Sequence, residues 1–143
     1  MSTTIERTVT TTAAPEKVFP YLVDFRNATE WDSGTESCER VSGDGGPGTV
    51  YKNVSKFAGN TVELEYTVDA VEQPRFVIVG RNDTTTSQDT ITVTPREGGS
   101  TVVYRADFTF TGLARFAGPL MRPLLDRLGD KTAAQLGSAL DRL

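Results

Sequence analysis

The strongest constraint on the fold is a long run of strand-like sequence between residues 35 and 111. Apolar and polar residues alternate there at a period of two, most clearly over 61–72 and 100–111. This pattern is typical of strands that have one buried and one solvated face. Turn signals rich in glycine, asparagine and proline divide the run, and the short connections predict antiparallel pairing. The predicted strands are 36–42, 48–58, 61–72, 75–82, 86–95 and 100–111.

The segment before this run predicts one more strand and two short helices. Residues 4–12 alternate and are rich in threonine, which favours a strand. Pro15 opens a helix, because proline is favoured at the first helical position. Pro20 lies inside that helix and is expected to kink or shorten it. Asp24 is a good N-cap for a second short helix over 25–31.

The C-terminal segment 113–143 predicts one long helix, with a firm start near 119–123 where two prolines occur. Its apolar residues recur at helical spacing and would cover the dry face of the sheet. They are Leu113, Phe116, Leu120, Leu124, Leu128, Leu136, Leu140 and Leu143. We therefore predict an α+β fold in which a curved antiparallel sheet of six to seven strands wraps around this helix. A bent sheet and a rod cannot touch everywhere, so we expect a hollow between them.

Size and charge narrow the class of protein. A chain of 143 residues is the usual size of one domain, so we expect a single domain over 1–143. The net charge of -4 argues against a nucleic-acid partner. No segment approaches the roughly 20 apolar residues of a membrane span. A lone cysteine, Cys38, and an N-terminus without an apolar core predict a reducing, cytoplasmic location. We expect the chain to be a monomer or a homodimer.

The sequence contains no histidine. It therefore lacks the commonest general base and metal ligand. With only one cysteine, neither a His/Cys zinc site nor a Ser-His-Asp or Cys-His triad can form within the chain. We predict no metal and no cofactor, and any catalysis must use the remaining polar side chains or the shape of a pocket.

The motifs near the N-terminus resemble those of a known superfamily. The stretch Ala13–Phe19, which contains Pro15, Glu16 and Val18, is followed by Asp24 and then by Trp31. A turn at 46–49 leads into a long hairpin, and the last helix ends in spaced leucines. Together with the order of elements, this is similar to the helix-grip fold of the START-like (SRPBCC) superfamily, polyketide cyclase/dehydrase-like branch. The resemblance covers essentially the whole chain.

What the resemblance implies is a cavity for a hydrophobic small molecule, such as a lipid or a polyketide. Our leading hypothesis is a binding protein for such a ligand. The alternative is an enzyme, a metal-free polyketide cyclase, aromatase or dehydratase without a His or Cys nucleophile, that holds a reactive chain in a near-attack shape. A third hypothesis, a protein interaction module, is disfavoured by the polar outer faces of the strands.

Asp89 and Tyr66 are the candidate catalytic pair. Asp89 shares a strand face with Ile91 and Val93, so it points inward if they do, and burial would then raise its pKa. The commoner situation is a carboxylate at the solvated start of a strand, because buried carboxylates are rare. Tyr66 and Tyr104 lie on the dry faces of their strands, where each hydroxyl needs a partner in the core or on a ligand.

The candidate ligand-binding residues are the aromatic and apolar side chains of these inward faces. On 48–58 the set Tyr51, Asn53, Ser55 and Phe57 lines the cavity if the lysines between them face water; otherwise this strand is an exposed edge. Trp31 lies either at the cavity mouth or, more commonly for a large aromatic residue, in the core. The full set of predicted ligand-binding residues is Trp31, Tyr51, Asn53, Phe57, Tyr66, Tyr104, Phe108, Phe110, Phe116, Met121 and Leu124.

Overall fold

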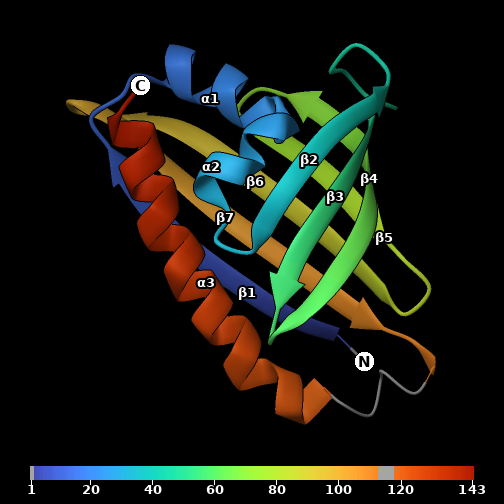
Figure 1. Ribbon diagram of the computed structural model, residues 1–143. Coiled ribbons are helices and arrows are strands. Elements are labelled where there is room, and N and C mark those ends of the chain that lie inside the picture. The colour runs from blue at the N-terminus through green and yellow to red at the C-terminus, as the bar shows by residue number, and fades with distance from the viewer. Residues whose placement is uncertain (1, 113–117) are drawn as a thin grey trace.

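The computed structural model describes residues 2–112 and 118–143 and consists of a seven-stranded sheet with helices on one face (Figure 1). The strands are β1 (Ser2–Thr11), β2 (Thr35–Ser42), β3 (Val50–Phe57), β4 (Asn60–Glu72), β5 (Arg75–Arg81), β6 (Thr85–Arg96) and β7 (Gly99–Phe110). The helical elements are α1 (Pro15–Val23), the 3-10 turn η1 (Phe25–Asn27), α2 (Ala28–Trp31) and α3 (Gly118–Asp141). All seven predicted strands are present, each within two residues of its predicted ends.

The sheet has the order β1-β7-β6-β5-β4-β3-β2, and every neighbouring pair is antiparallel. Strands β2 to β7 follow one another as hairpins, as the short turns predicted. The exception is β1, which pairs with the last strand, Ser2 opposite Thr109 and Thr11 opposite Ser100. The sheet curves around α3, which crosses its concave side (Figure 1). This is the predicted helix-grip fold.

The two short helices follow the prediction with small differences. Pro20 does not end α1, which continues to Val23, and the carbonyl of Pro20 accepts the N–H of Asp24. The predicted helix over 25–31 is a 3-10 turn followed by the short helix α2. Asp24 caps the turn as expected, because its side chain accepts the backbone N–H of Arg26 at 3.2 Å.

The buried stripe of α3 differs from the predicted one in its first turns. Met121 and Leu125 face the sheet, whereas Leu120 is 77% exposed. Successive steps of four residues drift by about 40° around a helix of 3.6 residues per turn. Counting back by fours from Leu128 therefore leads to the wrong face. Leu113 and Phe116 lie outside the described residues. No helix in the described ranges is long and apolar enough to cross a membrane.

The core is densely packed at the end of the sheet where α1, α2 and the last turns of α3 meet. Leu136 and Leu140 of α3 are fully buried there. Trp31 packs edge-on against Phe25 and Tyr104, with ring centroids 6.1 Å and 5.7 Å apart. At the opposite end a smaller group of buried side chains lies under the first turns of α3. The interior is therefore filled at one end and less filled at the other.

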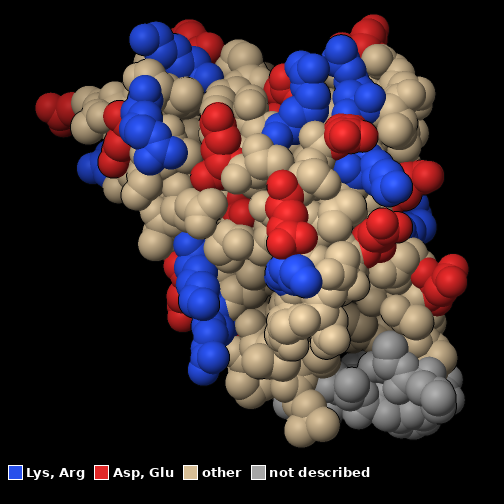
Figure 2. Space-filling view, viewed as in Figure 1, with Lys and Arg blue, Asp and Glu red and all other residues tan. Residues whose placement is uncertain are grey.

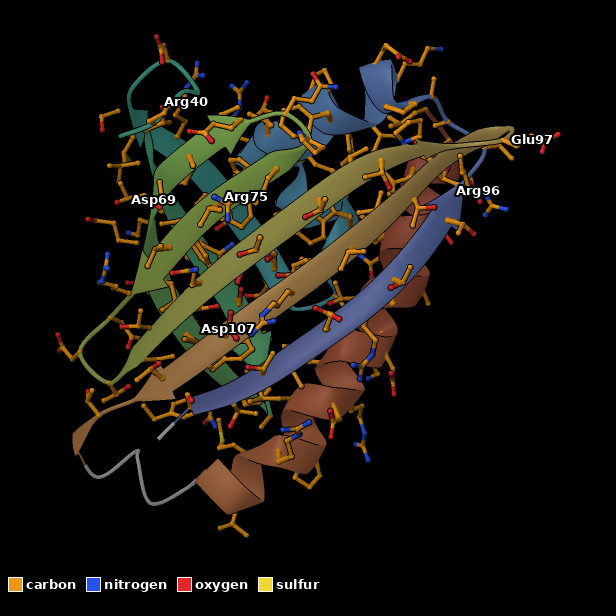
Figure 3. The ribbon with its side chains drawn as sticks, turned by 180° about the vertical axis from the view of Figure 1, so that it is seen from behind. Arg40, Asp69, Arg75, Arg96, Glu97 and Asp107 are labelled. Carbon is orange, nitrogen blue, oxygen red and sulfur yellow. The ribbon has the colours of Figure 1, made fainter. Side chains whose placement is uncertain are left out.

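The outer face of the sheet is polar, as the alternation predicted. Asp69, Arg75 and Asp107 lie on this face, on the side of the sheet away from α3 (Figure 3). Asp107 accepts a hydrogen bond from Thr4 Oγ1 at 2.6 Å and pairs with Arg105. Only the concave face is thus available for an apolar ligand.

Helix α3 packs very closely on β1. At Gly129 an added Cβ atom would lie 2.6 Å from Cγ2 of Ile5, which is itself buried. Arg7, on the same face of β1, reaches α3, and its Nε donates to Asp130 at 2.9 Å. Glycine at position 129 and the Arg7 ion pair together hold the helix against this edge strand.

We expect Gly129→Ala to destabilise the protein by about 1–3 kcal/mol, because the new methyl group overpacks the contact with Ile5. Helix propensity alone predicts the opposite, a gain of about 1 kcal/mol. Gly137→Ala in the same helix is the matched control, since its Cβ would lie 3.4 Å from Val9 Cγ1, an ordinary contact. Urea unfolding measures both. A Gly129→Ala protein as stable as the control would contradict the close packing.

Candidate functional site

A cavity of about 150 Å³ lies between the first half of α3 and the concave face of the sheet. Most of its wall is apolar, with hydroxyl and carboxyl groups at a few positions. The lining residues are Ile5, Asp32, Gly34, Ser55, Lys56, Phe57, Val62, Leu64, Tyr66, Thr85, Ser87, Tyr104, Ala106, Phe108, Phe110, Met121, Leu125, Leu128, Gly129 and Thr132. Pockets of this make-up are typical of small-molecule sites.

The strand residues among these point into the cavity because alternate side chains of a strand lie on the same face of the sheet. In β7 every second residue from Tyr104 to Phe110 points inward, and in β4 every second residue from Val62 to Tyr66 does so. The strand β3 presents Ser55 and Phe57 to the cavity. This settles the open question about its facing, because Tyr51 and Asn53 on the same face are buried while Lys52 is exposed.

The position of the Tyr66 ring depends on a glycine in the neighbouring strand, which has no side chain to displace the ring. Tyr66 is opposite Gly80 in the register of β4 and β5. An added Cβ on Gly80 would lie 2.6 Å from the Tyr66 ring. The ring therefore lies flat over the glycine, where no other residue would fit without displacing it. This packing keeps Tyr66 in the wall of the cavity.

Asp89 lies directly behind the cavity wall and is 3% exposed. Ser87 Oγ donates to Asp89 Oδ1 at 2.9 Å, and the Tyr104 hydroxyl donates to Oδ2 at 3.4 Å. Ser87 and Tyr104 both line the cavity, so a ligand would contact this carboxyl group through them. The inward alternative for Asp89 is correct, and the expectation of a solvated strand start is wrong.

Burial dominates the electrostatics of this group. Loss of water raises the pKa of Asp89 to about 7, against the opposing effect of the Ser87 hydrogen bond. Burial likewise raises the pKa of Tyr66 and of Tyr104 well above the ordinary value, and the negative charge of Asp89 adds to both shifts. Asp89 can therefore exchange a proton near neutral pH, whereas the two tyrosines stay protonated and can donate hydrogen bonds.

A second carboxyl group, Asp32, lines the cavity and was missed in the sequence. It accepts hydrogen bonds from Thr35 Oγ1 at 2.7 Å and from Thr132 Oγ1 of α3 at 3.0 Å. Burial raises its pKa, and the two threonine hydrogen bonds oppose that shift. Asp32 follows Trp31 in a short loop, a position where an aspartate is ordinarily solvated. The only local signal was Thr35 three residues later, because Thr132 lies 100 residues away along the chain.

A comparison of the sequence with known protein families identifies the family of this chain. Residues 2–141 match the model of the family described as polyketide cyclase / dehydrase and lipid transport. The chain belongs to this family. The predicted resemblance is thereby confirmed. A search of curated proteins finds no match.

Several solved structures have the same fold. The Zhui aromatase/cyclase from Streptomyces sp. R1128 superposes with a TM-score of 0.80 at 15% identity, over 99% of this chain and 93% of that one. A protein from Thermus thermophilus gives 0.75 at 22% identity, over 99% and 95%. A START superfamily protein from Mycobacterium smegmatis gives 0.70 at 17% identity, over 97% and 94%. At these identities the likeness shows the fold alone.

The structure brings six of the predicted ligand-binding residues together in the cavity wall. These are Phe57, Tyr66, Tyr104, Phe108, Phe110 and Met121. Trp31 and Tyr51 lie in the core, and Trp31 packs against Tyr104, which lines the cavity. Asn53 is also buried, donating to Thr35 and accepting from Ser55. Leu124 lines a neighbouring groove, and Phe116 is outside the described residues.

The described ranges contain no group of three or more acidic or cysteine side chains that could hold a metal ion. The cavity has one carboxyl group in its wall, at Asp32, and one behind the wall, at Asp89, together with several hydroxyl groups and the amine of Lys56. Such an arrangement can accept hydrogen bonds from a ligand and can move a proton.

The pKa of Asp89 predicts how stability changes with pH. The folded state holds the proton more tightly than the unfolded state, so the contribution of Asp89 to stability falls as pH rises from about 4 to about 7. Between pH 5 and pH 8 this loss amounts to roughly 2–3 kcal/mol at 1.36 kcal/mol per pKa unit. We expect Asp89→Asn to remove that loss, measured by urea unfolding at both pH values.

The control for this experiment is Asp107→Asn on the outer face of β7. The pKa of Asp107 is lowered, so it titrates below this window and its replacement leaves the change between pH 5 and pH 8 intact. If Asp89→Asn shows the same pH dependence as the unmodified protein, Asp89 is not the buried titrating group.

Proposed function

We propose that this protein binds a hydrophobic small molecule in the cavity between the sheet and α3. The observation that supports this most directly is the hollow itself, a partly open space of about 150 Å³ between the sheet and α3. Native interiors contain few voids larger than a water molecule. An engineered apolar cavity of about 150 Å³ binds benzene. The space here is thus large enough for one ring or a short branched chain.

The wall chemistry supports an apolar guest that carries a few polar atoms. Rings from β7 and β3 and aliphatic side chains from α3 and β4 surround the space. The hydroxyl groups of Tyr66, Ser87 and Tyr104 are the groups available for orientation. The family description, which joins polyketide cyclases with lipid transport, agrees with such a ligand.

Benzene is a direct probe of the cavity. Saturating benzene is expected to raise the free energy of unfolding by about 1 kcal/mol or more, because a ligand that binds only the folded state stabilises it. Leu64→Trp fills the cavity and is expected to abolish this gain, whereas Val41→Trp on the exposed side of β2 keeps it. Isothermal calorimetry and urea unfolding measure the effect. Absence of any benzene effect on the unmodified protein would overturn the proposed function.

A second function, ring closure or dehydration of a polyketide-like chain, is favoured by the hydrogen-bonded set formed by Ser87, Asp89 and Tyr104. In this proposal the Tyr66 hydroxyl donates to a ligand carbonyl. Asp89 takes the proton lost from the neighbouring carbon, through Ser87 or Tyr104. A pKa of about 7 suits this exchange, since an efficient acid or base has a pKa near the working pH.

Turnover of a short poly-β-ketone thioester, followed by the absorbance of the aromatic product, tests the enzyme proposal. We expect Asp89→Asn to lower the rate by about 10²-fold or more, the usual contribution of a general base. Benzene binding should be unchanged, because Asp89 is behind the wall. Equal turnover by both proteins would exclude Asp89 as the base, and no turnover by the unmodified protein above the uncatalysed rate would leave binding as the function.

A further inference from the structure

A groove of about 220 Å³ adjoins the cavity on the side where α3 passes the end of β3. The two spaces share Gly34, Lys56, Phe57 and Leu128, so they meet at this edge. An added Cβ on Gly34 would lie 3.1 Å from the backbone oxygen of Lys56 and 3.6 Å from Leu128. The glycine therefore stands at the junction and keeps it open. A ligand larger than the cavity would extend into this groove.

The groove is lined by three cations and no carboxylate. Lys56 comes from β3, and Arg127 and Lys131 come from successive turns of α3. None of the three lies within 4 Å of a carboxylate of residues 2–112 or 118–143, although Arg7, Arg26, Arg105 and Arg122 all make such ion pairs. The remaining segment near α3, residues 113–117, contains no Asp or Glu.

This concentration of positive charge is unusual for the chain, whose net charge is -4. The view of Figure 2 shows a largely uncharged area in the lower part of the face that carries α3, with a strip of Lys and Arg side chains beside it. Away from the shared residue Lys56 the cavity has the opposite character, because Asp32 lines it and Asp89 lies behind its wall. A negative group is thus disfavoured inside and favoured in the groove.

We propose that the ligand is an amphipathic anion, with its apolar end in the cavity and its carboxylate, or a similar anionic group, in the groove beside Lys56, Arg127 and Lys131. This rests on the proposed function. The small cavity takes only the apolar end, and the charge distribution fixes the direction of insertion. Three cations around one anionic group act together, whereas each exposed pair alone contributes little.

Two probes that differ only in charge test the proposal. The compounds 4-phenylbutyrate and 4-phenylbutan-1-ol share the ring that fits the cavity and a chain that reaches the groove. We expect the protein to bind the carboxylate about tenfold more tightly at low salt, with the difference shrinking as salt screens the cations. Isothermal calorimetry with the full chain gives both dissociation constants.

The variant with Lys56→Gln, Arg127→Gln and Lys131→Gln is expected to bind the two probes equally and to keep its affinity for the alcohol. A matched variant with Lys52→Gln, Arg81→Gln and Arg96→Gln removes the same charge from exposed positions that do not line either space. It is expected to keep most of the tenfold preference.

Each alternative result overturns a specific claim. Equal binding of both probes by the unmodified protein would overturn the anion site and leave the proposed function standing. The same would follow if the two triple variants lost the preference equally, because the effect would then be one of net charge. Binding of benzene but of neither phenylbutyl compound would also overturn the inference alone. If none of the three compounds binds, the proposed function itself fails.

Discussion

The close packing of α3 on β1 is the interaction on which the rest of the structure depends. The first strand, β1, pairs with β7 and forms one edge of the sheet. The last helix, α3, packs against this edge strand. Gly129 permits the approach, and the Arg7–Asp130 pair joins the two elements across their exposed side. Leu136 and Leu140 anchor the other end of the helix in the packed core. The helix is then held at one edge and one end, and the curved sheet turns away from it, which leaves the hollow.

The buried acids follow from the same geometry. Asp89 is in the interior because the strand period that buries Ile91 and Val93 also buries it, and the hydroxyl groups of Ser87 and Tyr104 satisfy its oxygen atoms. Asp32 is held by threonines from β2 and α3, so its position depends on where the helix lies. Buried polar groups are retained only when they are hydrogen-bonded. Both carboxyl groups meet this condition, and among residues 2–112 and 118–143 neither has a salt-bridge partner, so burial raises the pKa of each.

The cavity and the groove together form one site with two chemical ends. The cavity end is small, apolar and bordered by carboxyl and hydroxyl groups, and the groove end is open and positive. A neutral hydrocarbon uses only the first part, whereas an amphipathic anion uses both. The family spans binding proteins and cyclases, and fold alone does not choose between these activities. For this chain the choice depends on whether the proton on Asp89 is exchanged with a bound molecule.

Local periodicity and short turns were enough to predict the secondary structure, the antiparallel order of β2 to β7 and the residues that share each strand face. The motif around Pro15 and Trp31 also indicated the superfamily. Five of the six correctly predicted lining residues could be found because strand alternation puts them on the concave side, and the sixth, Met121, lies on the helix that covers it. Only the tertiary structure showed the cavity itself and the burial of Trp31 and Tyr51 in the core. It also showed that Asp32 lines the cavity and that Lys56, Arg127 and Lys131 line the same groove. Each depends on the path of α3 across the sheet, which brings together residues far apart in the chain, 100 positions for Asp32 and Thr132 and 123 for Arg7 and Asp130, and no local pattern encodes such contacts.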